Sequence, residues 1–196
     1  RGGPVPAAAR FLNPHAAGGT IGRQRGNSPM SDWYCGSVQH AAVAQWQASQ
    51  AYAVGDIVRQ LATPSNGNER CFRCTTAGTT GAAEPGWNLS RNATTTSGSA
   101  VFTEVTGNAT YNWAAPFARM HAILNSPGWM GAGDRLFVAH DHAETQASAM
   151  QISPGSGTSS KSNPHKAICV DAAGSVPPVS ADLRDTAQVS TTGNSN

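Results

Sequence analysis

The sequence predicts a mainly β protein of 196 residues with three parts. These are an extended basic arm (1–37), a small antiparallel β-module (38–110), and a capping helix leading into a parallel β-helix (111–196). Three observations predict this. Only 12% of the residues are charged and 21 are Gly, a composition typical of turn-rich β proteins. Short apolar runs separated by Gly, Pro and Asn clusters fill residues 38–107. After residue 110, a segment with helical periodicity is followed by short strands spaced like the rungs of a solenoid.

The arm is basic because four arginines precede the first acidic residue, Asp32: Arg1, Arg10, Arg23 and Arg25. It is rich in Pro, Gly and Ala and shows no sustained periodicity, which favours an extended docking arm for an acidic surface. A solvated tail is the alternative. Met30 reads well as an initiator, which leaves the origin of the first 29 residues open.

The module is predicted from several short strands. The segment AYAVGDIVRQL has alternating apolar positions around a Gly-Asp turn, and ERCFRCTTAG and AVFTEVTG read as further strands. In a strand, Cys71 and Cys74 of CFRC fall on opposite faces, which argues against one metal held by both thiols. We therefore expect both cysteines to be small buried hydrophobic residues.

The third part begins with an amphipathic pattern. The apolar spacing i, i+3, i+6, i+7 predicts a helix of about three turns, ended by NSPG, with Phe117, Met120, Ile123 and Leu124 on one face. The segment GDRLFVAHDHAE then predicts a strand with either Leu136 and Val138 or Phe137 and Ala139 inward. HKAICVDAAGS and AQVSTTGNSN predict two more. A helix covering the open end of such strands is typical of the start of a right-handed parallel β-helix. Because a solenoid requires about three repeats, we expect the natural chain to continue past Asn196.

These residues also carry a resemblance. The order WQASQAYAVGDIV, then CFRCTTAGTTGAAEPGW, then VFTEV resembles a module of bacteriophage tail-fibre and other virion proteins, and is distantly similar to small chitin-binding modules. The resemblance covers about seventy residues. It implies that the core and turns of the module are built by Trp46, Tyr52, Gly55, Asp56, Glu84, Pro85 and Trp87. GDRLFVAHDHAET similarly resembles the first rung of β-helices in phage tailspikes and fibres.

The resemblance implies a structural component of a virion that anchors a fibre, spike or decoration protein to capsid or tail. The implied partners are other virion proteins, two further copies in a homotrimer, and a host-surface glycan. Chitin-binding modules stack aromatic side chains on sugars, but the corresponding segment RCTTAGTTG has no aromatic residue. Trp46, Tyr52 and Trp87 are the candidate carbohydrate or partner contacts. A domain this small needs large side chains to bury enough area, which favours packing of Trp46 and Trp87 in the core over display at the surface. A carbohydrate-binding adhesin and the N-terminal part of a polysaccharide-degrading tailspike are alternative functions.

One short stretch could hold a metal. Written as a strand, His140, His142 and Glu144 share a face, and two histidines with a carboxylate are a known ligand set. A polar rung edge is the more ordinary reading, so no metal or other cofactor is expected. Asp134, Asp141 and Glu144 are candidate acids for glycoside hydrolysis, which requires a groove and a spacing of roughly 5–10 Å.

Other function classes are disfavoured. The net charge of +2 is too small to predict nucleic-acid binding by the whole chain. No apolar run approaches the roughly 20 residues needed to cross a bilayer, so no membrane insertion is expected. Nucleophile-elbow, phosphate-loop, zinc-protease and dinucleotide motifs do not occur, and we expect no enzymatic activity in these residues.

Overall fold

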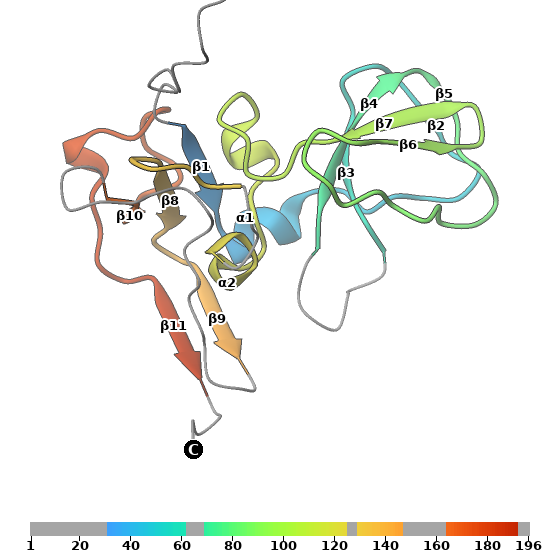
Figure 1. Ribbon diagram of the computed structural model, residues 1–196. Coiled ribbons are helices and arrows are strands. Elements are labelled where there is room, and N and C mark those ends of the chain that lie inside the picture. The colour runs from blue at the N-terminus through green and yellow to red at the C-terminus, as the bar shows by residue number, and fades with distance from the viewer. Residues whose placement is uncertain (1–30, 62–68, 125–128, 147–163, 192–196) are drawn as a thin grey trace, which may run out of the picture.

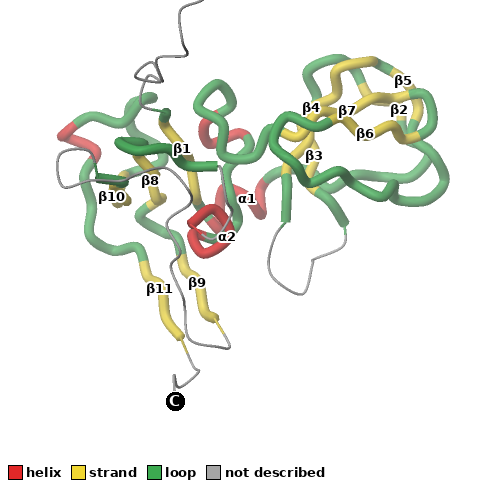
Figure 2. The backbone as a smooth tube through the Cα atoms, viewed as in Figure 1, coloured by secondary structure: helices red, strands yellow, loops and turns green. Residues whose placement is uncertain are grey.

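The computed structural model describes residues 31–61, 69–124, 129–146 and 164–191, and shows a mainly β chain with two short α-helices (Figure 1). Its strands form two groups, one antiparallel and one parallel, with the helices α1 (Ser37–Ala42) and α2 (Met120–Leu124) near their junction (Figure 2). No helix in these described ranges is long and apolar enough to span a bilayer.

The antiparallel group is the expected β-module. Four strands pair in the order β3-β4-β7-β6, and two more, β2 and β5, form a separate ribbon. The strands are β2 (Ala51–Tyr52), β3 (Ile57–Arg59), β4 (Cys71–Thr76), β5 (Gly78–Thr79), β6 (Thr94–Ser97) and β7 (Ala100–Glu104). The Gly-Asp turn lies between β2 and β3 as predicted. Gly55 has φ of +108°, a conformation that side chains disfavour, and the Asp56 carboxylate accepts a hydrogen bond from the Ala53 N–H at 2.8 Å.

Alternation along β4 separates the two cysteines. Phe72 and Cys74 pack into the module core with Trp46 and Phe102, whereas Cys71 packs on the other face with Val105. Both thiols are buried and unpaired. The prediction that they face opposite sides is therefore confirmed.

The parallel group, here called the strand stack, consists of two ladders. In the first, β8 (Arg135–Ala139) lies between β1 (Asp32–Cys35) and β10 (Lys166–Val170); in the second, β9 (Ala143–Gln146) pairs with β11 (Gln188–Thr191). All pairings are parallel and in register, so β8 and β9 form one layer and β10 and β11 form the next. The sequence predicted three of these strands, β8, β10 and β11, whereas β1 and β9 were not predicted as separate strands. Two layers do not establish a complete β-helix, and that finer expectation stays a prediction.

β8 is buried on both faces, so both of the residue pairs that the sequence offered as inward-facing are buried. Leu136 and Val138 pack with Trp33 and Phe117, while Phe137 packs with Tyr34 on the opposite side. Parallel strands covered on both faces read as continuous apolar runs, which explains why alternation could not select one face.

The layer of β8 and β9 is covered by residues 32–37, which the sequence placed in the extended arm. Residues 32–37 were assigned to the extended arm, but they form β1 and the start of α1, so this boundary is corrected. β1 pairs along β8, and the Ser37 hydroxyl accepts a hydrogen bond from the Ala143 N–H at 3.1 Å, at the start of β9. A strand and a helix that precede the module therefore cover the end of the strand stack.

The predicted three-turn helix is shorter than expected. Among the described residues only Met120–Leu124 of this segment are α-helical. The helix begins no earlier because the backbone of Phe117 bonds instead to β1: its N–H donates to the Tyr34 carbonyl at 2.9 Å and its carbonyl accepts from the Gly36 N–H at 2.9 Å. Ala122 and Ile123 of α2 still pack against Trp33 and Leu136, so the helix covers the core as expected. Its predicted end at residues 125–128 lies outside the described residues.

The module and the strand stack are joined by two arginines, one buried and one exposed. The Arg70 guanidinium, in a residue 2% exposed, lies 5.0 Å from the ring centroid of Phe117 and 4.7 Å from that of Trp129. Arg91 lies 4.7 Å over the Trp33 ring. Cations of the module that rest on aromatic rings of the stack therefore connect the two groups.

Candidate functional site

The candidate metal ligands lie at the corner between β8 and β9. β8 ends at Ala139, and a turn follows in which the His142 N–H donates to the Ala139 carbonyl at 2.9 Å. This turn breaks the two-residue alternation, so His140 points away from His142 and Glu144. The proposed three-ligand face is therefore wrong. Within the described ranges, no group of three or more His, Cys, Asp or Glu side chains is placed to hold a metal ion.

His142 and Glu144 form a buried pair on the inner side of the corner. The His142 Nε2 lies 3.3 Å from the Glu144 Oε2, and their side chains are 0% and 1% exposed. The Ser37 N–H donates to the His142 Nδ1 at 3.1 Å, so Nδ1 is an acceptor and the ring proton lies on Nε2, facing Glu144. Glu144 also accepts the Met120 N–H at 2.7 Å, which ties β9 to the start of α2.

The charge of Glu144 influences its surroundings. Burial raises the pKa of the Cys35 thiol, and the Glu144 carboxylate raises the pKa of that thiol further. Cys35 is therefore a neutral, unreactive thiol inside the strand stack. The His142–Glu144 pair holds α1, α2 and β9 together, and its atoms are engaged by these elements.

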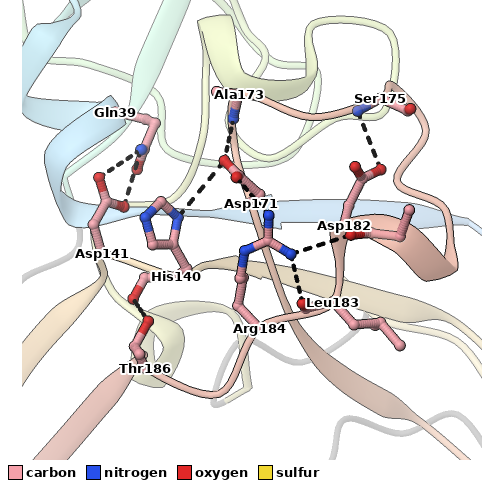
Figure 3. Close-up of polar contacts among 11 residues, drawn as sticks. Gln39, His140, Asp141, Asp171, Ala173, Ser175, Asp182, Leu183, Arg184 and Thr186 are labelled. Carbon is pink, nitrogen blue, oxygen red and sulfur yellow. Dashed lines mark hydrogen bonds and ion pairs between the residues drawn. The ribbon is translucent and has the colours of Figure 1, made fainter.

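His140 lies on the outer side of the corner, where it contacts the second layer (Figure 3). Its Nδ1 is 3.8 Å from the Asp171 Oδ1, and its carbonyl accepts a hydrogen bond from the Thr186 hydroxyl at 2.8 Å. Arg184 donates to the Asp171 Oδ2 at 3.0 Å. These contacts connect the corner of the first layer to the loop that follows β10.

That loop, residues 171–187, is organised by two aspartates. Asp171 accepts the Ala173 N–H at 2.9 Å, and this hydrogen bond lowers the pKa of the Asp171 carboxyl. Asp182 lies in the short 3₁₀ helix η2 (Ser180–Asp182) and accepts the Ser175 N–H at 3.1 Å (Figure 3). It also accepts the Val179 N–H at 2.9 Å. The carboxylates of these two aspartates thus accept hydrogen bonds from backbone N–H groups of the loop.

The three candidate hydrolytic acids, Asp134, Asp141 and Glu144, each contact a different set of residues. Asp134, before β8, accepts the indole N–H of Trp33 at 3.0 Å and the backbone N–H groups of Ser31 and Gly131, both at 2.8 Å. Asp141 is exposed and contacts the Gln39 amide at 3.0 Å. Together with the engaged Glu144, these acids belong to three different sets of contacts.

A pocket of about 250 Å³ lies at the junction of the module and the strand stack. Its polar lining comes from α1, the module, the segment just before α2 and β9, and includes Ser37, His40, Arg59, Glu69, Arg119 and Glu144. We call it the junction pocket. The His40 Nδ1 lies 3.5 Å from the Glu69 Oε2, and the His40 Nε2 is buried without a hydrogen-bond partner. Burial lowers the pKa of the His40 imidazole to about 4, so this side chain is neutral at pH 7.

The candidate aromatic contacts belong mainly to the module core. Trp46 is 1% exposed, which excludes stacking of its ring on a sugar in this structure, and its role as a binding residue is corrected. Trp87 stacks on Phe72 with ring centroids 4.0 Å apart and donates its indole N–H to Glu84 at 2.8 Å. Tyr52 packs edge-on against Phe102, and its hydroxyl accepts the Gln47 N–H at 3.0 Å. Trp87 and Tyr52 are only partly buried.

The far side of the strand stack has a different surface. β8 pairs with a strand on both edges, whereas among the described residues the only strand that pairs with β10 is β8 and the only one that pairs with β11 is β9. The outer edge of β10 is bridged only at its end, where Val170 pairs with Leu183 of the following loop. Accordingly, Lys166 and Ala167 of β10 are exposed where their register partners on β8 are wholly or partly buried. The neighbouring loop exposes three apolar side chains, Val176 at 50%, Val179 at 52% and Leu183 at 53%. We call this side of the strand stack, formed by β10, β11 and the loop between them, its open end.

Sequence reasoning missed the junction pocket. His40, Arg59, Glu69 and Arg119 are spread over eighty residues without a shared spacing, so only the packing of the two groups brings them together. The docking-arm residues Arg1, Arg10, Arg23 and Arg25 lie outside the described residues. Comparison with family models, curated proteins and solved structures finds no match to this chain.

Proposed function

We propose that this protein is a structural component of a bacteriophage virion. In this proposal it anchors a fibre, spike or decoration protein to the capsid or tail, and contributes to attachment at the host surface. The role is mechanical and involves no chemical step. It follows from the resemblance of the module and the first rung to phage fibre and tailspike proteins.

The open end of the strand stack is the observation that best supports this role. The layer of β8 and β9 is covered on one side by β1 and α1 and on the other by β10 and β11. Apart from the bridge between Val170 and Leu183, the outer edges of β10 and β11 therefore have no strand partner among the described residues, and they continue the register of the layer below. Unpaired edges of this kind are templates for further strands. We propose that a further parallel layer covers them, which makes the described residues the capped start of a parallel β-helix.

The proposal assigns the basic arm to the particle and the strand stack to the fibre. An arm that spreads its contacts over several partner subunits adds affinity as linked binding sites do. Homotrimeric assembly is part of the proposal, because it is implied by the fibre resemblance. The exposed Val176, Val179 and Leu183 lie at the open end, where an added layer or a neighbouring copy would cover them.

Deleting residues 1–29 in the producing phage tests the anchoring role. The deletion leaves β1 and all later elements intact, so we expect an unchanged urea midpoint for the purified protein but loss of the protein from purified particles. A matched variant that keeps the arm length but replaces Arg1, Arg10, Arg23 and Arg25 with Gln separates charge from length. Incorporation of the deleted protein at the normal level would refute the anchoring role.

A further inference from the structure

The junction pocket has features that the structural role does not use. It is formed only when the module and the strand stack come together, since α1, β3, the segment before α2 and β9 each contribute to its lining. Its volume of about 250 Å³ lies just below the roughly 300–1,000 Å³ of pockets for drug-sized ligands. It therefore suits a molecule of about one sugar ring or smaller.

The junction pocket is lined by two arginines and two glutamates, but their side chains differ in the contacts that they make. Glu144 accepts the Met120 N–H and faces His142, and Glu69 lies beside His40. By contrast, no hydrogen bond or ion pair joins the Arg119 side chain to another residue that the structure describes. Arg59 donates its Nε–H to the Val43 carbonyl at 3.0 Å. The lining thus offers a free guanidinium, while its carboxylates are already engaged.

His40 adds a hydrogen-bonding group of a different kind. It is 3% exposed, and the nearby Glu69 carboxylate favours the tautomer with the proton on Nδ1. Its Nε2 is then an acceptor, and it is buried without a partner. Since unsatisfied buried polar atoms are costly, a ligand hydroxyl that donates to this atom would stabilise the complex.

We propose that the junction pocket binds a small hydroxy-carboxylate. The Arg119 guanidinium binds the carboxylate, and a neighbouring hydroxyl of the ligand donates to the His40 Nε2. Sugar acids and simple hydroxy acids share this chemistry. This binding is independent of the virion role, and either can hold without the other.

Titration of the isotope-labelled full chain with D-glucuronate, lactate and D-glucose, followed by amide NMR, tests the proposal. We expect glucuronate to cause saturable shifts at Ser37, Ala143 and Thr145, which line the pocket, and glucose to cause none. Tighter binding of glucuronate than of lactate would identify a sugar acid, and the reverse a simple hydroxy acid. Equal binding of glucose, or no saturable shift with any probe, would overturn the proposal.

Two variants locate the binding. Arg119→Gln should weaken glucuronate binding about tenfold or more, as expected for loss of one charge-assisted hydrogen-bonded contact. Lys166→Gln is the matched control, because it removes the same charge from exposed β10 outside the junction pocket and should leave affinity unchanged. Equal affinities for Arg119→Gln and the parent chain, with both folded by their amide spectra, would also overturn the proposal.

Discussion

The Asp32 carboxylate accepts two hydrogen bonds from the Arg135 guanidinium, from Nε at 2.8 Å and from Nη2 at 2.9 Å. The two residues are register partners across β1 and β8, and Lys166 of β10 is the next residue in the same row. The hydrogen bonds from Arg135 to Asp32 raise the pKa of the guanidinium. This bidentate pair fixes β1 on β8 in a single register, and so places the strand that covers the stack.

Asp32→Asn should lower the free energy of unfolding by about 0.5–1 kcal/mol, because the pair is partly exposed and screened by solvent. Urea denaturation at low and high salt measures the loss, which should shrink as salt increases. A double-mutant cycle with Arg135→Gln isolates the interaction. Full additivity of the two single changes would show that the pair does not hold the register.

Trp46→Ala should destabilise the protein by roughly 3–5 kcal/mol, since it empties the centre of the module core. The urea midpoint measures this change. Val54→Ala, at a position 59% exposed, is the control and should have little effect. A small loss for Trp46→Ala would show that the indole is displayed at the surface, as a carbohydrate contact would be.

His40 should make stability depend on pH between about 4 and 6.5. Burial lowers the pKa of His40 from 6.5 to about 4, with Arg59 and Arg70 also lowering it and Glu69 opposing them. In this window the unfolded chain binds a proton that the folded chain does not. The unfolding free energy therefore falls as pH decreases from 6.5 to 4, by roughly 3 kcal/mol in total for this group.

Comparison of the parent chain with His40→Gln isolates that contribution, because all other titrating groups are shared. We expect the difference in unfolding free energy between the two proteins to change with pH through this window and to be constant above pH 7. A difference that is independent of pH would contradict the assignment of a buried neutral His40.

Gly107→Ala should destabilise the link between the module and the strand stack by roughly 2–4 kcal/mol. Gly107 has φ of +68°, and an added Cβ would meet the Phe117 ring. Its N–H also donates to the Ala115 carbonyl at 2.6 Å. Gly86→Ala is the control, because nothing lies within 4 Å of its added Cβ. Thermal unfolding should show a large difference between the two variants, and equal stability would contradict this packing.

Strands with strong local signals were predictable from the sequence. The module strands around Gly55 and CFRC, and the strands that contain Phe137, Ile168 and Val189, lie where alternation and turn residues placed them. β1 was missed as a strand, because DWYC is four residues long and its pairing partner β8 begins a hundred residues later. Its conformation is decided by tertiary pairing, to which local propensity gives little guide.

The candidate site was predicted less well, for two physical reasons. The turn after Ala139 reverses the side on which His140 lies, and strand periodicity cannot anticipate such a turn. The junction pocket depends on contacts between segments far apart in the chain, as the pairing of His40 with Glu69 illustrates. By contrast, the small size of the module favours inward packing of Trp46, and the structure places the ring in the core.

The most direct test is a cryo-electron microscopy map of the producing phage particle that resolves this chain in place. Our account predicts that the chain lies at the base of a fibre or spike, with its arm against capsid or tail. It further predicts that the outer edges of β10 and β11, beyond the bridge between Val170 and Leu183, pair in parallel with a further layer of strands. A chain absent from the particle, or β10 and β11 edges that remain open or pair antiparallel, would contradict it.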